Sequence, residues 1–381
     1  SFELIEWCHD NGVLYIDTSI EPWPNYHDNP DVPADHRTTY YLRHITFEMA
    51  KRWPKRSPSA LVTHGANPGL ITYLAKQAIM DVAAFSGVDA TKPETREGWA
   101  ALARSIGLKT IHIAEHDTQI ASKPKQPGEF VNTWSVPGFW EEGLQPSELG
   151  WGTHEKTLPH DAREFSVGTR CAIYLERPGC LTKVRSWTPK GGPFIGMAIA
   201  HAESGTLADL LTLRENGEAV YRPTVYFAYH PCNDALLSIL EMEGRSFTPP
   251  RRSRILGEDI VDGMDELGAL LMGDFGAYWY GSQLSIQEAR SLLGPEFNPT
   301  SIQIAMPVVA GVLWLIEHPD RGLVEPEDLD HEYILDICRP FLGPVVGVRT
   351  DWTPLRARGR LFPEPQLDHE DPWQFVNFRK V

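Results

Sequence analysis

The alternation of apolar and polar residues at the start of the chain predicts a helix that leads into a short strand. Apolar side chains recur at helical spacing from Phe2 to Cys8, and the pair Asn11-Gly12 is typical of a helix end. The following VLYID (13–17) has the apolar character of a short buried strand. A helix followed by a buried strand is the second half of a βαβ unit.

The next segment continues this pattern. A helix is predicted over 40–53 and a buried strand over 60–63, after which HGANPG (64–69) turns the chain into another helix with one apolar side. Asn67 suits the N-cap of that helix, and Pro68 suits its first position. Turns at the carboxyl ends of parallel strands are where open α/β sheets bind ligands, although a plain strand-to-helix turn is the simpler interpretation of these residues alone.

From residue 93 onward, strand-like segments alternate with helical ones. A helix is expected over 95–106, and a strand over 108–114 carries Glu115 at its end. Further strands are expected over 172–175, 183–187, 195–201 and 224–229, with helices over 207–214 and 234–243. This mixture predicts an α+β domain with a mixed sheet. After it, 302–318 is predicted as an apolar helix, and the last residues are predicted as a docked tail.

Composition narrows the class of protein. The chain has 381 residues, of which 42% are hydrophobic, and its net charge is −16. These values are typical of a soluble protein long enough for two domains. An acidic surface argues against nucleic acid and anionic membranes and would steer a polycation inward. The five cysteines are scattered without a CxxC pair, which fits reduced thiols in the cytoplasm, and the apolar run 308–316 is too short to span a bilayer.

The strongest chemical signal lies in 131–153, read together with 111–117 just before it. Neither segment contains a Lys or an Arg. Their aromatic and acidic residues include Trp134, Phe139, Trp140, Trp151, Glu115, Glu141, Glu142 and Glu148. Rings beside carboxylates can bind an organic cation, because the ring face attracts an ammonium group that the carboxylate neutralises. By composition alone, a Gly/Pro-rich loop with core tryptophans and solvated glutamates is the commoner arrangement.

Short blocks spread over the whole chain add a resemblance to a known family. The blocks are HGANPG (64–69), NTW (132–134), EEGLQP (141–146), ELGWGT (148–153), YRPT (221–224), YHPCNDA (229–235), AYWYGSQLS (277–285) and GPVVGV with TDWTPL (343–355). They resemble bacterial homospermidine synthases, which are NAD-dependent enzymes with a saccharopine-dehydrogenase-like fold. The resemblance implies an α/β protein in which an incomplete Rossmann-like NAD-binding domain joins an α+β substrate domain with a mixed sheet.

The resemblance also implies how the chain divides. Residues 1–92 would be the remaining part of the NAD-binding domain, 93–298 the substrate-binding domain, and 299–381 a helix and tail that return to the NAD-binding domain. The chain contains no GxGxxG, the glycine fingerprint that holds a dinucleotide pyrophosphate. In the family this fingerprint lies upstream of the point where the chain begins, with Ser1, so we expect the sequence to be part of a longer protein.

Enzymes of this family join two putrescines, or putrescine and an aminobutyl group from spermidine. The diamine loses a hydride to NAD, a second diamine displaces the first nitrogen of the resulting imine, and the hydride returns to the product. A site for this reaction must hold a cationic carbon chain beside the nicotinamide, remove one amine proton and keep water from the imine. The family is typically a homodimer, and we expect a cytoplasmic enzyme.

The resemblance assigns roles to residues in the matching blocks. Trp134 would lie against the ammonium or imine cation, in a contact worth roughly 2 kcal/mol when desolvated. Glu142 would bind the distal ammonium and set substrate length, with Glu141 as the neighbouring alternative. Glu115 and Asn67 would hold the reacting amine near the nicotinamide. We therefore predict Trp134, Glu115 and Asn67 as catalytic residues, although each could instead be a core residue or a solvated loop residue.

Three further residues complete the predicted site. Glu21 would receive the second amine at the pocket mouth, while Thr18 and Asn67 would contact NAD because both lie at the carboxyl ends of predicted parallel strands. His230 joins the catalytic set because a neutral imidazole, with an ordinary pKa of about 6.5, can accept an amine proton. A hydrogen-bonded packing role fits His230 equally well. Four of the other histidines show no ligand spacing, so we predict no metal ion.

Two other functions stay open at the level of sequence. Another oxidoreductase of this fold, such as a saccharopine or carboxynorspermidine dehydrogenase, would act on a carboxylated substrate and would use Arg to bind its carboxylate. The Glu and Trp content of 131–153 favours an uncarboxylated diamine instead. A polyamine-binding module without catalysis is the second alternative, because the chain lacks the glycine fingerprint.

Overall fold

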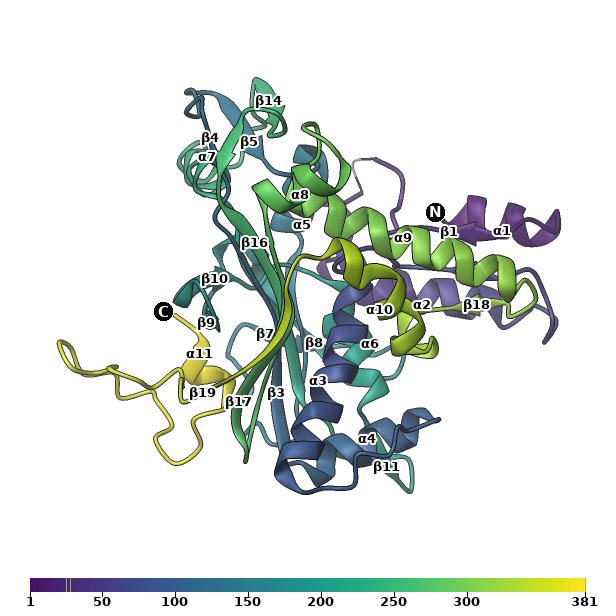
Figure 1. Ribbon diagram of the computed structural model, residues 1–381. Helices are drawn as coiled ribbons and strands as arrows, with labels where there is room; N and C mark the ends of the chain where they lie inside the picture. The colour runs from purple at the N-terminus through teal and green to yellow at the C-terminus, as the bar shows by residue number, and fades with distance from the viewer. Residues whose placement is uncertain (25, 28, 381) are drawn as a thin grey trace.

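Two sheets organise the computed structural model of the protein, which describes residues 1–24, 26, 27 and 29–380 (Figure 1). The first is a small parallel sheet with the strand order β1 (Tyr15–Ile16), β2 (Ala60–Leu61) and β18 (Leu323–Val324). The helices beside it are α1 (Phe2–Asp10), α2 (Thr39–Ala50) and α9 (Pro299–Glu317). The small sheet is thus completed by segments from opposite ends of the sequence.

Two groups of contacts hold these helices on the small sheet. Ile5 of α1 and Leu42 of α2 share a small apolar core with Tyr15 of β1. α9 approaches β1 so closely that a Cβ on Gly311 would lie 2.7 Å from a methyl carbon of Ile16. A side chain at Gly311 would therefore push α9 away from the sheet.

The second sheet has ten strands and is mixed. Its main path runs in the order β19 (Val345–Thr350), β17 (Gly276–Ser285), β16 (Met264–Gly273), β3 (Leu108–Asp117), β13 (Thr224–His230), β6 (Pro146–Gly150), β8 (Ala172–Pro178) and β7 (Ala162–Glu164). Two further strands extend from β13, namely β10 (Gly192–Met197) and then β9 (Lys183–Thr188). β3 and β13 are parallel, whereas the other neighbours in this sheet are antiparallel.

Helices cover one face of the large sheet, and the C-terminal tail covers the other. α3 (Leu70–Ser86) contacts β16 and β17, α6 (Ala202–Leu210) contacts β13 and β6, and α10 (His331–Cys338) packs on α3. In Figure 1, α3 and α6 lie on one side of the sheet, and the tail with α11 (Phe375–Phe378) lies on the other. The tail contributes aromatic side chains to a core on that face, namely Trp352, Trp373, Phe375 and Phe378. The tail is therefore docked, as expected.

Shorter elements connect these layers. The remaining helices are α4 (Arg96–Ser105), α5 (Val136–Leu144), α7 (Asn233–Gly244) and α8 (Ile286–Leu293), with 3-10 turns at Ala34–Arg37, Gly179–Leu181, Pro326–Asp328 and Arg339–Phe341. The two-stranded pairs are β5 (Glu129–Asn132) with β14 (Arg252–Ile255), β4 (Ile120–Ala121) with β15 (Ile260–Asp262), and β11 (Leu213–Glu215) with β12 (Glu218–Tyr221).

The structure divides the chain at other points than the sequence analysis does. α3 falls within the predicted unit 1–92, yet it packs on β16 and β17 of the large sheet. The part of the chain built on the small sheet is called the small unit below, and its first segment therefore ends before residue 70. The predicted segment 299–381 is also divided. α9 and β18 join the small sheet, whereas β19 and the tail join the large sheet, because β19 pairs along β17 and the aromatic side chains of the tail are buried on that sheet.

α9 is longer than its apolar run suggests. Among the described residues it is the one helix whose length and composition would allow it to cross a membrane, and 56% of its apolar window is buried inside the protein. Its N-cap Asn298 accepts a hydrogen bond from the backbone N–H of Ser301, and Pro299 occupies the first turn, which sets the start of the helix. We interpret α9 as a core helix of the small unit.

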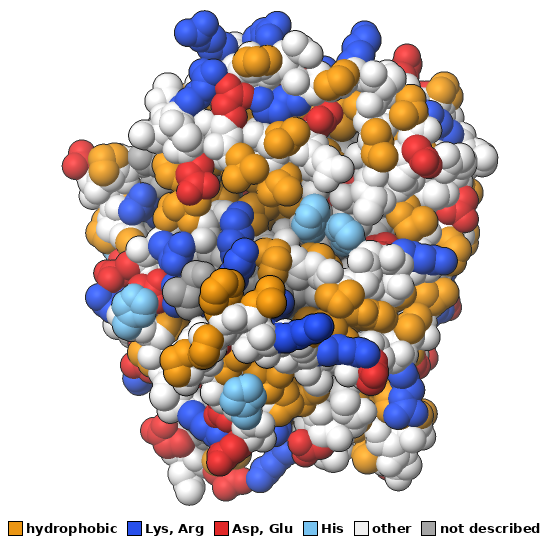
Figure 2. All heavy atoms as spheres, turned by 90° about the vertical axis from the view of Figure 1, so that its left-hand side faces the viewer, with side chains coloured by type: hydrophobic (Ala, Val, Ile, Leu, Met, Phe, Trp, Pro, Cys, Tyr) orange, Lys and Arg blue, Asp and Glu red, His pale blue; other side chains and the backbone are white. Residues whose placement is uncertain are grey.

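The negative net charge does not gather into one field on the face that carries the tail. Figure 2 shows basic, acidic and apolar side chains interspersed across this face.

Candidate active site

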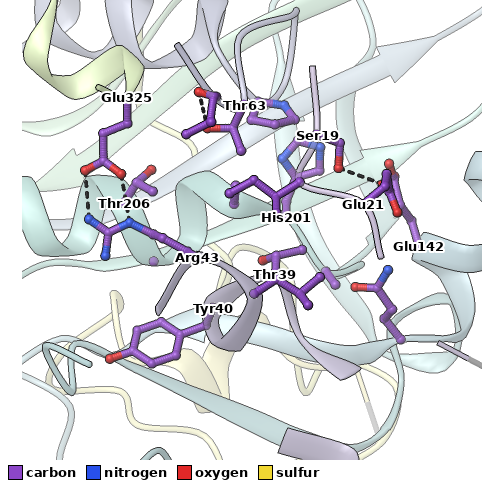
Figure 3. A pocket seen from close by; sticks show the side chains of 18 of the residues that line it. Ser19, Glu21, Thr39, Tyr40, Arg43, Thr63, Glu142, His201, Thr206 and Glu325 are labelled. Carbon is purple, nitrogen blue, oxygen red and sulfur yellow. Dashed lines mark hydrogen bonds and ion pairs between the residues drawn. The ribbon is translucent and has the colours of Figure 1, made fainter. Parts of the chain in front are cut away.

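Two adjoining pockets lie between the small unit and the large sheet. The first, called the Trp134 pocket, has among its lining residues Thr18, Asn67, Glu115, Trp134, Tyr229 and Thr300. The second, called the Arg43 pocket and drawn in Figure 3, has among its lining residues Glu21, Thr39, Arg43, Thr206 and Glu325. Four residues line both pockets, namely Ser19, Pro68, Glu142 and His201. The two pockets are therefore neighbouring chambers of one site.

The large sheet contributes to the Trp134 pocket through its two parallel strands. Glu115 on β3 and Tyr229 on β13 stand opposite each other in the register, and both line the pocket. Side chains alternate between the two faces of a strand, so the next residues along, His116 and His230, lie on the other face. Phe227, two positions before Tyr229 on β13, shares its face and also lines the pocket, whereas the residue that follows Glu115 or Tyr229 lies on the opposite side.

His230, a predicted catalytic residue, is not among the residues that line either pocket. Its ring centroid lies 4.7 Å from that of His116 and 6.1 Å from that of Phe194, and its Nδ1 lies 3.0 Å from the carbonyl oxygen of Pro231. Burial lowers the pKa of His230. His230 does not line the pocket because side chains alternate along β13, so the residue after Tyr229 cannot lie on the same face as Tyr229. The packing role that the sequence left open fits this position.

Glu115 is a buried carboxylic acid held by Asn67. Asn67 Nδ2 donates a hydrogen bond to Glu115 Oε2 at 2.5 Å. Burial raises the pKa of Glu115 well above its ordinary value, the charge of Asp265 adds to this rise, and the hydrogen bond from Asn67 opposes it. The expected N-cap role of Asn67 is wrong, because α3 begins at Leu70 with Gly69 as its N-cap. The side chain of Asn67 forms its hydrogen bond with Glu115 instead.

Two more buried acids stand beside Glu115. Asp117 and Asp265 face each other in the register of β3 and β16. Burial raises the pKa of both, to about 6 for Asp117, and the charge of Asp117 adds to the rise for Asp265. Thr300, which lines the Trp134 pocket, donates to Asp265 Oδ2 at 2.7 Å. A bound cation would relieve this accumulation of acidic groups.

Trp134 joins the site from the NTW block between β5 and α5. Its indole Nε1 donates to Tyr229 Oη at 3.1 Å, and its ring centroid lies 5.4 Å from that of Phe139. Ser135 caps α5 by accepting a hydrogen bond from the backbone N–H of Gly138 at 3.1 Å. A Cβ on Gly138 would come within 3.1 Å of the Trp134 ring. The turn that starts α5 therefore holds the indole beside the pocket.

Glu142 stands where the two pockets meet, whereas its neighbour Glu141 is not among the residues that line either one. Burial raises the pKa of Glu142 to about 8, His201 opposes this rise, and the charges of Glu21 and Glu203 add to it. An acid with this pKa is mostly protonated at neutral pH and ionises when an ammonium group lies beside it.

Two further residues of the site, His201 and Glu203, were not predicted from the sequence. His201 Nδ1 lies 2.6 Å from Glu203 Oε2, and both side chains are buried at the start of α6. Burial alone would lower the pKa of His201, but the charge of Glu203 raises it above the ordinary value. Glu203 Oε1 also accepts the backbone N–H of Gly69 at 2.8 Å. The expected strand 195–201 is wrong after Met197, and the acidic residue in the first turn after His201 is the signal of a helix start.

Glu21 lines the Arg43 pocket. Its carboxylate accepts a hydrogen bond from Ser19 Oγ at 2.7 Å and lies 3.7 Å from His27 Nε2. The side chain of Glu21 is 48% exposed, whereas that of His27 is buried. Glu21 is thus open to solvent on one side, which is consistent with a position at a pocket mouth.

Thr18 and the turn 65–69 lie just after the carboxyl ends of β1 and β2. A Cβ on Gly69 would lie 2.6 Å from the backbone nitrogen of Gly65, and one on Gly65 would lie 3.2 Å from the Thr18 side chain. Gly69 also has a φ of +128°, which favours glycine. Thr18 and Gly65 both line the Trp134 pocket. A turn that presents bare backbone at this edge of a parallel sheet fits the close approach of a dinucleotide.

The part of the chain that the structure describes contains neither a disulfide nor a cluster of metal-ligating side chains. All five cysteines are described, and they are free and buried. Within the described residues, no group of three or more His, Cys, Asp or Glu side chains is arranged to hold a metal ion.

Comparison with family models divides the chain in a similar way to the structure. Residues 1–61 match the model of the saccharopine dehydrogenase NADP binding domain, and residues 65–349 match that of the saccharopine dehydrogenase C-terminal domain. The step between the two models falls before α3, in agreement with the packing of α3 on the large sheet.

Individual relatives give a finer assignment. A homospermidine synthase of Blastochloris viridis is 51% identical over 99% of the chain and 79% of the relative, and one of Mesorhizobium japonicum is 48% identical over 99% and 78%. The crystal structure of the homospermidine synthase from Legionella pneumophila in complex with NAD superposes with a TM-score of 0.93 at 49% identity, covering 100% of the chain and 80% of that structure. The resemblance and the expected fold class are thereby confirmed. The chain belongs to the homospermidine synthase family, within the saccharopine-dehydrogenase-like fold.

Proposed function

We propose that the chain joins two putrescines, with release of ammonia, or putrescine and the aminobutyl group of spermidine, with release of 1,3-diaminopropane, into homospermidine with NAD as the cofactor. The observation that carries this proposal is the composition of the Trp134 pocket. An indole and two carboxyl groups, from Trp134, Glu115 and Glu142, meet there, and no Lys or Arg is among its described lining residues. Such a wall favours a bare diammonium chain over a carboxylated substrate. Family membership supports the same reaction.

We assign the NAD site to the edge of the small sheet. When bound, NAD takes a hydride from the carbon that carries the reacting amine and gives it back to the product, so that no net oxidation occurs. Thr18 and the turn 65–69 would hold the cofactor at the carboxyl ends of β1 and β2. Trp134 would stabilise the substrate cation with its ring face, and its hydrogen bond to Tyr229 would keep the ring in place.

Glu115 is the group that we assign to the amine proton. Asn67 orients it by donating to Oε2, so we assign Oε1 to the substrate. Burial and the nearby Asp265 raise the pKa of Glu115, which brings a carboxylic acid closer to the range in which it can take up a proton. The enclosed position of Glu115 between β13 and β16 also limits the access of water to an imine.

Glu142 is the group that we assign to the distal ammonium. It faces both pockets, and the His201–Glu203 pair lies beside it. A protonated His201 would limit the negative charge that Glu142 and Glu203 can gather without a substrate, and an incoming ammonium would take over that role. Glu21 would receive the second amine from the Arg43 pocket.

The arrangement of the chain follows from these assignments. We propose that residues 1–64 with α9 and β18 form the part of the NAD-binding unit present in the chain, and that the large sheet with its helices and tail forms the substrate unit. A cytoplasmic homodimer is the expected form. The free buried thiols and the burial of α9 in the small unit support the cytoplasmic location.

The proposal is tested by steady-state formation of homospermidine from putrescine with NAD+. Product should form with putrescine alone, and adding a 2-oxo acid or an aspartate semialdehyde should not be needed. Product only with the carboxylated partner would instead assign the chain to a saccharopine- or carboxynorspermidine-type reaction. A thermal shift with putrescine but none with NAD+, and no product, would identify a polyamine-binding module without catalysis.

A further inference from the structure

We propose that Arg43 sets the preferred length of the diamine by preventing Glu325 from binding an ammonium group. The inference rests on the proposed function, because it concerns how far the same cationic chain extends into the Arg43 pocket. Arg43 and Glu325 both line this pocket. Figure 3 shows the pair on one side of the pocket and Glu21 and Glu142 on the other.

Both carboxylate oxygens of Glu325 are already used. Arg43 donates from Nε to Oε2 at 2.8 Å and from Nη2 to Oε1 at 2.7 Å, which is a two-pronged contact. Arg96 donates from Nη2 to Oε1 at 2.6 Å. Arg96 is not among the residues that line the Arg43 pocket, so it reaches Glu325 from outside it. The side chain of Glu325 is 1% exposed.

The Arg43 guanidinium is held in this position by two more contacts. Its Nη2 donates to Asp209 Oδ2 at 3.1 Å, and its central carbon lies 4.9 Å from the ring centroid of Phe47. The positive charge of Arg43 is therefore held in place by contacts within the protein and does not depend on a bound substrate. The contact with Asp209 also means that Arg43 is not free to receive a substrate carboxylate.

The two sides of the pocket consequently differ in what they offer an ammonium group. A carboxylate bound by a guanidinium fork has few lone pairs left, and the charge of Arg43 repels a second cation. Among the described residues, no Lys or Arg forms an ion pair with Glu21 or Glu142. An ammonium group is therefore retained near Glu142 and Glu21, and a longer chain gains nothing by extending to Glu325.

The test compares chain-length preference in the wild type and in Arg43→Gln. The kcat/KM for putrescine, cadaverine and longer α,ω-diamines is measured with NAD+ as the cofactor. In the wild type putrescine should be the best substrate. In Arg43→Gln, Glu325 becomes an acceptor for a distant ammonium, so the ratio of kcat/KM for the longer diamine to that for putrescine should rise about tenfold, the effect of one charged hydrogen bond.

Three control variants separate the charge effect from a general loosening. Arg96→Gln removes the other arginine of Glu325 outside the pocket, and it should leave the preference unchanged. Arg43→Lys keeps a positive charge beside Glu325 and should stay close to the wild type. The double variant with Arg43→Gln and Glu325→Gln should lose the gain for longer diamines, because the new acceptor is gone.

The outcomes distinguish this inference from the proposed function. A wild type that converts putrescine, together with an unchanged ratio in Arg43→Gln, overturns the inference and leaves the function standing. A gain that persists in the double variant, or that equally appears in Arg96→Gln, also overturns it. A wild type that forms no product from putrescine overturns the proposed function itself. If Arg43→Gln does not fold, Arg43→Met keeps the apolar stem over Phe47 and carries the same expectation.

Discussion

At the scale of single residues, the alternation along β3 and β13 decides which side chains can reach a ligand. Glu115 and Tyr229 line the Trp134 pocket, while His116 and His230 pack together on the opposite face. The block YHPCNDA marked the right strand, but a motif does not say which of two adjacent residues faces inward. That choice depends on strand register, which only the tertiary structure supplies.

Trp134→Ala should remove most of the activity with putrescine, while Trp134→Phe should retain part of it. The loss of the ring face costs about 2 kcal/mol, which is roughly thirtyfold in kcat/KM. Phenylalanine keeps a weaker ring face but loses the hydrogen bond to Tyr229. Steady-state kinetics of both variants make the measurement, with Tyr229→Phe as the control for that hydrogen bond. Equal activity of the Ala and Phe variants would exclude a cation–π role.

The wild type should release a proton when it binds putrescine, and Glu142→Gln should abolish this release. Burial raises the pKa of Glu142 to about 8, so below this pH the carboxyl group holds a proton that the bound ammonium must displace. Affinity for putrescine should therefore rise with pH by at most about tenfold per unit and level off above about pH 8. Calorimetric titration at about pH 7, in buffers of different ionisation enthalpy, counts the proton. Undiminished release in Glu142→Gln would mean that another acid is responsible.

At the scale of elements, the sequence pattern finds helices with one apolar side better than strands buried on both faces. The expected helices at 2–11, 40–53 and 302–318 correspond to α1, α2 and α9 with small shifts at their ends. The long strands β16 and β17 were not predicted, because both are buried on two faces yet contain glycines and polar residues, so they show neither alternation nor a continuous apolar run. The position of α6 was shifted, and with it the two site residues at its start were missed.

Asn298→Ala should destabilise the protein more than the loss of an ordinary helix cap. The Asn298 side chain caps α9 and also donates to the carbonyl oxygens of Thr133, in the NTW block, at 2.8 Å and of Leu256 at 3.0 Å. The cap contributes about 1 kcal/mol, and each buried carbonyl left without a donor adds about 1 kcal/mol or more. Activity should fall as well, because Thr133 precedes Trp134.

The matched control is Thr95→Ala, which removes the cap of α4 on the surface. It should lower the free energy of unfolding by about 1 kcal/mol and leave kcat unchanged. Urea unfolding and steady-state kinetics of both variants make the comparison. Equal effects of the two substitutions would mean that Asn298 acts as a cap alone.

At the scale of the whole molecule, a network of ion pairs joins the two units. Arg43 on α2 contacts Asp209 of α6, and both Arg43 and Arg96 contact Glu325. Arg43 and Glu325 are 282 positions apart in the sequence. No local pattern could have paired them, since they meet only because β18, which precedes Glu325, pairs with β2 in the small sheet that α2 packs on. The family resemblance, by contrast, predicted the global fold because it covers the whole chain.

Glu325→Gln should destabilise the protein at neutral pH, and the difference should disappear in acid. Burial alone would raise the pKa of Glu325, but Arg43 and Arg96 lower it to about 2. A carboxylate with a lowered pKa stabilises the folded state above its ordinary pKa, and this stability is lost as the pH falls from about 4.5 to about 2. Breaking the buried pair should cost roughly 3 kcal/mol at neutral pH. Urea unfolding at several pH values measures the difference, and a pH-independent difference would contradict this account.

The two adjoining chambers give two identical, symmetric substrate molecules different surroundings. Ser19, Pro68, Glu142 and His201 line both chambers, and the other residues that line the two chambers differ. Two copies of the same symmetric diamine would thereby acquire different fates, one as donor and one as acceptor. The different roles in the reaction would then follow from the chamber in which each diamine binds, because the two molecules themselves are identical.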